Sequence, residues 1–295
     1  MNTLTIATVQ YGLSNTLTIQ LFWTRLTAKI REAAELGAEL IIFPEYMTAH
    51  LLSFEPIMSH EEACRHLDSY TEEYIEFFQR CSREWDIIIV GGSHICREKN
   101  GFVNKAFLFF PDGRIETQNK LHLTPEEQNL WSLVEGDTLH VFETKWGLVC
   151  LLTCYDIEFP ELARIAAQRG VELILCPSYT DTSYGYHRVR HCCQARAIEN
   201  QLFVALSGMV GRLPLVRPQV DQGYCQAGVF SPCDIPFNDQ GVIEVGEPNR
   251  DMIVFAVLDF AKLRLNRMHG VVAPFYNRRP ALYEKEVQKM VAENR

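Results

Sequence analysis

Short apolar runs alternate with amphipathic helical stretches along nearly the whole chain, and this alternation limits the fold more than any other feature. Residues 4–9 predict a strand, residues 21–36 predict a helix that Gly37 ends, and residues 39–43 predict a second strand. This β-α-β order is typical of layered α/β folds, in which helices cover the faces of a sheet. We therefore expect an α/β protein.

The rest of the chain repeats this order with one interruption. Two extended runs within residues 103–121 flank the turn sequence Pro111-Asp-Gly-Arg and predict an antiparallel hairpin. We expect an exposed loop at 211–222, and one domain over residues 1–275 followed by a tail, 276–295, that packs on the domain or on a partner subunit. Further strands are expected at 87–90, 148–153, 171–176, 201–207, within 227–245 and at 252–259, and further helices at 70–85, 161–169 and 187–200.

Charge and composition narrow the classes of partner and compartment. The formal net charge is -9 and no run is rich in Lys or Arg, which argues against nucleic acid or an anionic membrane as the main partner. No apolar run approaches the roughly 20 residues that a membrane-spanning helix needs. The ten cysteines are scattered, some within apolar runs, and the amino terminus lacks the basic flank of a signal peptide. We expect a soluble, cytoplasmic protein with reduced thiols and a small-molecule ligand.

One cysteine lies where a buried strand is expected to end and a helix to begin. Cys154 follows the apolar run 148–153, and Pro160 suits the first turn of the next helix. The positive end of a helix favours a negative charge, so this position predicts a thiol with a lowered pKa and higher nucleophilicity. The alternative is a buried structural thiol, because free cysteine is among the most buried residue types.

Two charged residues also fall at the ends of expected strands. Glu45 follows the apolar run Leu40-Ile-Ile-Phe-Pro, which should desolvate its carboxyl group, raise its pKa and suit it to proton transfer. Lys120 ends the second arm of the hairpin, and near a thiolate it would stabilise both the sulfur anion and an oxyanion. Taken alone, each would be read as a solvated surface charge.

Taken together, these segments resemble the nitrilase, or carbon-nitrogen hydrolase, superfamily. The matching motifs are Phe43-Pro-Glu45, Asn119-Lys120-Leu-His, Cys154-Tyr-Asp-Ile-Glu-Phe-Pro-Glu, Ala195-Arg-Ala-Ile-Glu-Asn200, Asp239-Gln-Gly241 and Arg279-Pro-Ala-Leu-Tyr283. The resemblance implies a four-layer α-β-β-α sandwich with two central mixed β-sheets. It also implies a homodimer or a larger homo-oligomer.

By this resemblance, Glu45 is the general base and acid, Lys120 stabilises charge and Cys154 is the nucleophile. The backbone N–H of Tyr155 would help to hold the oxyanion. The resemblance implies no metal and no organic cofactor. A second glutamate that orients the lysine is Glu126 or Glu127, and the spacing to Lys120 favours Glu127; the residues expected to contact substrate are Tyr46, Ser178, Tyr179 and His187.

The resemblance also separates the candidate reactions. Cys154-Tyr-Asp resembles the amidase and carbamoylase branches, whereas nitrilases proper tend to have Cys-Trp-Glu. We therefore expect hydrolysis of a small amide through a cysteine thioester, with nitrile hydrolysis as the alternative and a catalytically silent binding protein as a third reading. A metal site is not expected, because the residues that could form one lack a second pair of ligands elsewhere: Cys150, Cys154, His187, His191, Cys192 and Cys193.

Overall fold

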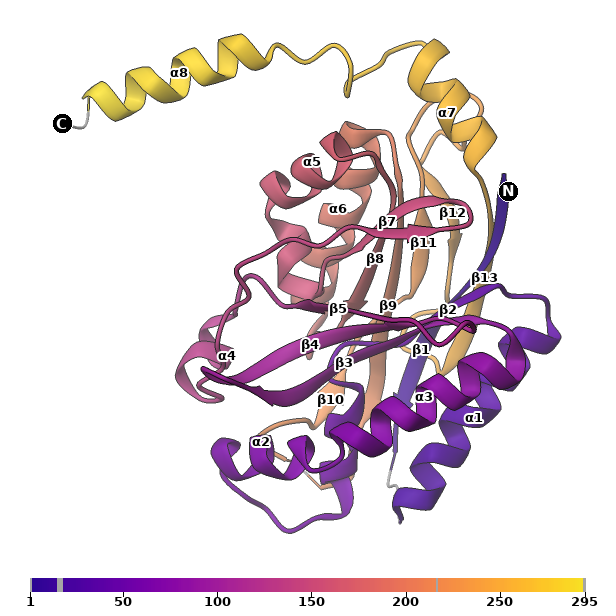
Figure 1. The fold of residues 1–295 in the computed structure, drawn as a ribbon, viewed down its shortest axis with the longest axis vertical. Helices are drawn as coiled ribbons and strands as arrows, with labels where there is room; N and C mark the ends of the chain where they lie inside the picture. Colours follow the sequence, from indigo (N-terminus) through magenta and orange to yellow (C-terminus); the bar gives the residue numbers. More distant parts are fainter. Residues whose placement is uncertain (1, 15–17, 216, 294–295) are drawn as a thin grey trace.

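The chain folds into four layers, with two helical layers outside two layers of strands (Figure 1). The computed structural model describes residues 2–14, 18–215 and 217–293. Helices α1 (Ile19–Glu35) and α3 (Thr71–Trp85) cover one side. Helices α5 (Pro160–Gln168) and α6 (Ser183–Asn200) cover the other. The expected four-layer α-β-β-α architecture is therefore confirmed.

The strands form one continuous hydrogen-bonded path, in the order β5-β4-β3-β2-β1-β9-β8-β7-β6. The expected two sheets are its two halves, joined where Gln10 of β1 pairs with Gly208 of β9 in parallel. The bounds are β1 (Thr3–Leu13), β2 (Leu40–Ile42), β3 (Ile88–Glu98), β4 (Gly101–Phe109), β5 (Ile115–Asn119), β6 (Phe142–Thr144), β7 (Gly147–Leu151), β8 (Val171–Ser178), β9 (Phe203–Arg212), β10 (Gln222–Gly223), β11 (Gly228–Phe230), β12 (Val242–Val245) and β13 (Met252–Asp259). The other elements are the 3-10 helices η1 (Met47–Phe54) and η2 (Cys154–Glu158), and helices α2 (His60–Asp68), α4 (Pro125–Asn129), α7 (Phe260–His269) and α8 (Pro280–Glu293).

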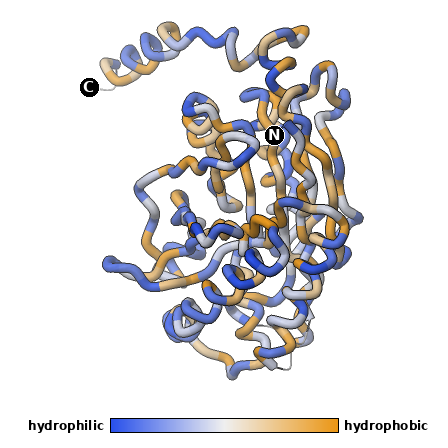
Figure 2. Tube along the Cα trace, turned by 45° about the vertical axis from the view of Figure 1, so that its right-hand side comes forward, coloured by the Kyte–Doolittle hydropathy of each residue, from blue (hydrophilic) through white to orange (hydrophobic). Residues whose placement is uncertain are grey.

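Alternating side chains of the strands fill the space on both faces. Leu4 and Ile6 of β1 join the core between the two halves of the sheet, while Ala7 and Val9 join the core beneath α1 and α3. Successive side chains of a strand point to opposite faces, so a strand covered on both faces is apolar throughout. Figure 2 shows this pattern as predominantly hydrophobic central strands.

Most expected elements form, but two expectations were wrong. Strand β3 does not end at Gly91-Gly92; it continues to Glu98 through a bulge between Val90 and Ser93. The described residues of 211–222 are only in part exposed: Arg212, Pro214, Leu215 and Pro218 are exposed, whereas Leu213, Arg217, Gln219 and Val220 are buried. The buried guanidinium of Arg217 donates to the backbone oxygens of Ser53 and Glu55.

The carboxyl-terminal helix α8 extends away from the rest of the chain (Figure 1) and has no buried residue. The boundary at 275 and the packing of the tail on a partner subunit stay predictions. All ten cysteines are free. Within the described ranges, no helix has both the length and the apolarity to cross a bilayer.

Candidate active site

The three candidate catalytic residues follow three strands of different parts of the sheet, and the fold brings them to one cavity. Glu45 is the third residue after β2, Lys120 directly follows β5, and Cys154 is the third residue after β7. All three are buried and line the same cavity of about 440 Å³. Lys120 Nζ donates to Glu45 Oε1 at 2.7 Å.

A sharp corner in the chain directs Glu45 toward the lysine. Tyr46 has a positive φ of 55°, and its N–H donates to the hydroxyl of Ser93 at 3.0 Å. The corner packs against Gly92, where an added Cβ would lie 1.9 Å from the carbonyl oxygen of Pro44. Only glycine fits at this point of β3, which explains the glycine pair in the middle of a strand.

Glu127, and not Glu126, is the glutamate that contacts the lysine. Its carboxylate accepts from Lys120 Nζ at 2.7 and 2.9 Å and from the hydroxyl of Tyr46 at 2.6 Å. The same carboxylate completes a capping box at the start of α4, since its Oε2 accepts from the N–H of Thr124 at 2.8 Å. Glu126 is exposed. The cap of a short helix thus fixes the orientation of the lysine's second carboxylate.

The two buried carboxylates differ in their proton affinity. Burial raises the pKa of Glu45, and the charge of Glu127 raises it further, against the opposing charge of Lys120. Burial would also raise the pKa of Glu127, but the charge and hydrogen bonds of Lys120 outweigh it and lower that pKa. Burial opposes the charge of Lys120, yet Glu127 and Glu45 together raise its pKa well above the ordinary value. Lys120 and Glu127 therefore form an ion pair, and Glu45 is the carboxyl group of the two with the higher affinity for a proton.

Cys154 has a positive φ of 48° at the start of η2, a conformation that few residues with side chains adopt. The hydroxyl of Ser178 donates to its Sγ at 3.3 Å, and the thiol lies 3.5 Å from the carbonyl oxygen of Tyr179. Burial raises the pKa of Cys154 well above its ordinary value, and the charge of Glu45 adds to this effect. The expected lowering of the pKa by a helix dipole was wrong, because α5 begins only at Pro160 and a helix dipole acts within its first turn.

Two further residues hold this cluster together, and neither was predicted from the sequence. Asn104 of β4 donates through Nδ2 to Glu45 at 2.9 Å and to Glu127 at 3.1 Å. The only signal for it was a polar residue in a largely apolar strand that also contains Lys105, and such a residue needs a partner when it is buried.

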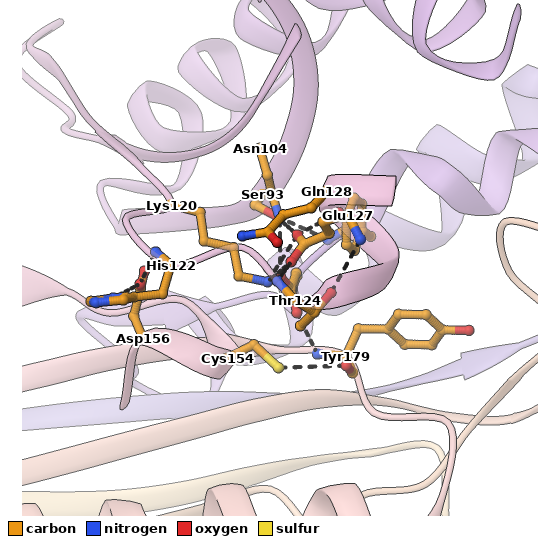
Figure 3. A network of polar contacts seen from close by, with 12 residues as sticks. Ser93, Asn104, Lys120, His122, Thr124, Glu127, Gln128, Cys154, Asp156 and Tyr179 are labelled. Carbon is orange, nitrogen blue, oxygen red and sulfur yellow. Dashed lines mark hydrogen bonds and ion pairs between the residues drawn. The ribbon is translucent and has the colours of Figure 1, made fainter. Parts of the chain in front are cut away.

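Asp156 is the second unpredicted residue. Its buried carboxylate accepts from the backbone N–H groups of Leu121, at 3.2 Å, and His122, at 2.7 Å, and contacts His122 Nδ1 at 3.1 Å (Figure 3). Asp156 lies two residues after Cys154, and its carboxylate accepts hydrogen bonds from the backbone of the two residues that follow Lys120. Asp156 therefore connects the turn that carries the cysteine to the segment that carries the lysine.

The expected substrate-contact residues divide into two pairs. Tyr46 and Tyr179 line the cavity, together with Trp131, which stacks on Tyr46 at a centroid distance of 5.3 Å. Ser178 does not line the cavity, because its hydroxyl is turned toward Cys154 Sγ. His187 is exposed and does not line it either, whereas the following residue, Arg188, does. Among the residues that the structure describes, no group of three or more His, Cys, Asp or Glu side chains could hold a metal ion.

The second wall of the cavity comes from the segment 218–221, which was expected to be an exposed loop. Its residues are distant in sequence from every recognised motif, and no pattern within 211–222 indicated that it folds against the site.

Comparison with known proteins places the chain among hydrolases of carbon–nitrogen bonds. The family model described as carbon-nitrogen hydrolase matches residues 5–235. A Bacillus subtilis protein named probable hydrolase YhcX is 38% identical over 96% of this chain, which spans only 55% of that relative's length. Bovine omega-amidase NIT2 is 28% identical over 98% of this chain and all of its own length. A crystal structure of an amidase from Nesterenkonia sp. has a TM-score of 0.75 at 21% identity, covering 96% of this chain and 95% of that one.

Proposed function

Because the chain belongs to the carbon-nitrogen hydrolase family, we propose that it hydrolyses a small amide through a thioester on Cys154 and releases ammonia or an amine. The observation that carries this proposal is the contact of Lys120 with both Glu45 and Glu127 beside a buried thiol in a closed-in cavity. A protein that only binds a ligand has no use for a buried base, cation and thiol side by side.

The first half of the reaction forms the thioester. Glu45 takes the proton of the Cys154 thiol, and the sulfur attacks the amide carbon. The N–H groups of Lys120 and the backbone N–H of Tyr155 would hold the resulting oxyanion. Glu45 then gives its proton to the departing nitrogen, the C–N bond breaks, and ammonia or an amine leaves.

The second half regenerates the enzyme. Water attacks the thioester carbon while Glu45 accepts a proton from it, the C–S bond breaks, and the proton returns to the sulfur as the acid leaves. The raised pKa of Glu45 suits both directions of transfer, because a catalytic group works best when its pKa is near the working pH. The hydroxyl of Ser178 donates to the sulfur and would stabilise the transient thiolate.

Amide hydrolysis is favoured over nitrile hydrolysis on two grounds. Cys154 is followed by Tyr-Asp, as in the amidase and carbamoylase branches, and relatives over most of the chain include proteins named omega-amidase. Nitriles therefore serve as the comparison substrates in any screen.

The test is an ammonia-release screen of carboxamides, carbamoyl compounds and nitriles with the wild-type chain, Cys154→Ala and Cys154→Ser. The matched control is Cys233→Ala, which removes an exposed thiol outside the cavity. We expect turnover of at least one amide by the wild type and by Cys233→Ala, and none by either Cys154 variant with unchanged circular dichroism.

Turnover by Cys154→Ala equal to that of the wild type would refute the mechanism. Release of ammonia from nitriles alone would replace the proposed reaction with nitrile hydrolysis. A wild-type chain that turns over no compound of the three classes would favour a catalytically silent member.

A further inference from the structure

The cavity wall carries more negative than positive side chains outside the cluster of Glu45, Lys120 and Glu127. Beyond the catalytic residues, the lining includes the carboxylates of Glu126, Glu158, Asp181 and Asp221 and one cation, Arg188. Arg188 Nε donates to Glu158 Oε1 at 2.8 Å, so the single cation already has a counterion. Three carboxylates of the wall remain without an ion pair among the described residues: Glu126, Asp181 and Asp221.

These three carboxylates come from three separate segments and converge on one part of the cavity. Glu126 belongs to α4, Asp181 precedes α6, and Asp221 precedes β10. After burial itself, the charges of Asp221, Asp181 and Glu126 all contribute to raising the pKa of the Tyr179 hydroxyl. The three carboxylates therefore line the same cavity as Tyr179 and act on its hydroxyl. The backbone N–H of Tyr179 donates to Glu45 Oε2 at 3.0 Å.

A buried neutral acceptor on the same wall points to the same kind of ligand. The side chain of Gln219 is 6% exposed and lines the cavity. Its Nε2 donates to the carbonyl oxygen of Met58 at 3.0 Å, and its Oε1 receives no hydrogen bond within the described part of the chain. An amide oxygen without a donor on a cavity wall can accept a hydrogen bond from a ligand that brings an N–H group.

The cavity lining also includes apolar side chains. Trp131, Val220 and Pro218 line the cavity and offer surface to methylene groups. A ligand that fits would place its amide at Cys154, an aliphatic chain along these residues, and a donor group at the carboxylates.

From this distribution we propose that the substrate is a primary amide, or a carbamoyl compound, that carries a protonated amine at the end away from the reacting carbon. The proposal rests on the amide hydrolysis proposed above. Glu126, Asp181 and Asp221 are the specificity-determining charges, and Gln219 Oε1 is a neutral hydrogen-bond acceptor for the same ammonium group.

The first test compares three amides with the same three-methylene spacer: γ-aminobutyramide, which is cationic, valeramide, which is neutral, and glutaramate, which is anionic. We expect kcat/KM for the cation to exceed that for the neutral amide by about tenfold, which corresponds to ~1.4 kcal/mol from several partly exposed charges. The preference should shrink as ionic strength rises, because salt screens exposed charges. Equal or better turnover of valeramide or glutaramate would overturn the proposal.

Variants assign the preference to particular residues. In Glu126→Gln/Asp181→Asn/Asp221→Asn the ratio of cation to neutral amide should fall to within about twofold. The control, Glu32→Gln/Glu35→Gln/Glu73→Gln, changes the net charge equally on exposed positions of α1 and α3 and should keep the wild-type ratio. A ratio that changes equally in both triple variants would show an effect of net charge alone and contradict the proposal.

A measurement on Cys154 itself separates this proposal from the proposed reaction. Aminoethyl and sulfonatoethyl methanethiosulfonates modify thiols with a cationic and an anionic reagent, and peptide mass mapping assigns the modification to Cys154. Relative to the same ratio for free mercaptoethanol, the cationic reagent should be favoured about tenfold or more in the wild type and much less in the cavity triple variant. If the cationic reagent is favoured but no amide is hydrolysed, the proposed reaction is rejected and the charge preference stands. If amides are hydrolysed but neither the cationic reagent nor the cationic amide is favoured, the charge preference is rejected and the reaction stands.

Discussion

Two carboxylates share one lysine at the base of the cavity, and the balance between them sets which one carries the mobile proton. Glu127 has a lowered pKa and Glu45 a raised one, although both are buried and both contact Lys120 Nζ. At Glu127 the charge and hydrogen bonds of Lys120, with help from Tyr46 and Thr124, outweigh the effect of burial on the pKa. At Glu45 burial and the charge of Glu127 outweigh the charge of Lys120. Glu127 is thus the carboxylate that stays ionised beside Lys120, which is why the proposed mechanism uses Glu45 as the base.

This balance predicts the pH dependence of Glu127→Gln. Glu45 must be ionised to accept the thiol proton, so kcat/KM of the wild type should fall as pH falls through a pKa above the ordinary carboxyl value of 4.5. Glu127→Gln removes a negative neighbour that raises the pKa of Glu45. We expect kcat to fall about tenfold or more and the acid limb to move to lower pH.

The matched control is Glu98→Gln, which removes the carboxylate of another Glu–Lys pair, with Lys105, outside the cavity. Its pH profile should match that of the wild type. An acid limb that moves to higher pH in Glu127→Gln would contradict the assignment of the mobile proton to Glu45.

Asp156 provides a second prediction at the residue scale. Asp156→Asn should weaken the grip on the N–H groups of Leu121 and His122, and so shift Lys120 relative to Cys154. We expect kcat to fall about tenfold with little change in KM, because small displacements of a catalytic group cost rate more than binding.

Glu172→Gln is the control for Asp156, since it alters a buried carboxylate that binds Arg264, away from the cavity. It should lower the thermal midpoint without changing kcat. A lowered midpoint with wild-type kcat in Asp156→Asn would show that Asp156 is structural only.

The sequence predicted the candidate site residues that follow strands. It did not predict Asn104, whose contacts depend on how the strands pair. Glu45, Lys120 and Cys154 stand in recognisable local motifs. Asn104 reaches Glu45 and Glu127 only because β4 and β5 pair in a particular register, with Lys105 opposite Asn119. The register depends on how whole strands pack, so the sequence around Asn104 does not indicate which residues its side chain will contact.

Among the elements, the short helix α4 links local sequence to the site most directly. Its capping box uses the same Glu127 carboxylate that binds Lys120. Thr124→Ala removes the side-chain cap, and we expect a loss of about 1 kcal/mol in unfolding free energy together with a reduced kcat, since Glu127 loses part of its support.

Ser59→Ala is the matched control for Thr124→Ala, because Ser59 and Glu62 form the corresponding capping box of α2, outside the cavity. It should cost similar stability and leave kcat unchanged. If Thr124→Ala and Ser59→Ala had the same kcat, the capping box of α4 would have no effect on catalysis, contrary to the prediction.

The elements show where sequence patterns are sufficient. Periodicity located α1 and α3 and the hairpin of β4 and β5 well, because each buries one face against a neighbour. It failed at 211–222, where prolines and polar residues indicated exposure, since burial there depends on partners such as the backbone oxygens of Ser53 and Met58.

On the scale of the whole molecule, the folded-over sheet explains how distant segments make one cavity. Glu45 and Lys120 belong to the half of the sheet that includes β2 and β5, and Cys154 belongs to the half that includes β7. The two halves pack face to face through a shared apolar core. The general four-layer order followed from the sequence by resemblance, but the continuity through β1 and β9 did not.

The tail provides a prediction at the same scale. Removing residues 280–295 should leave the thermal midpoint of the folded domain unchanged, because α8 has no buried residue. If the tail packs on a partner subunit, as we propose, sedimentation velocity should show a smaller species after truncation. A lower midpoint without a change in assembly would contradict both the domain boundary and the partner contact.

The central claim is that Cys154 carries the acyl group during turnover. Intact mass should be measured for the wild type, acid-quenched while it hydrolyses an amide, and for Glu45→Gln incubated with the same amide. The account predicts an increase equal to the mass of the amide minus ammonia in the wild type, mapped to Cys154. It predicts no such increase in Cys154→Ala, which lacks the nucleophile, or in Glu45→Gln, which lacks the base. An unmodified Cys154 during active turnover, or an adduct on another cysteine such as Cys233, would contradict it.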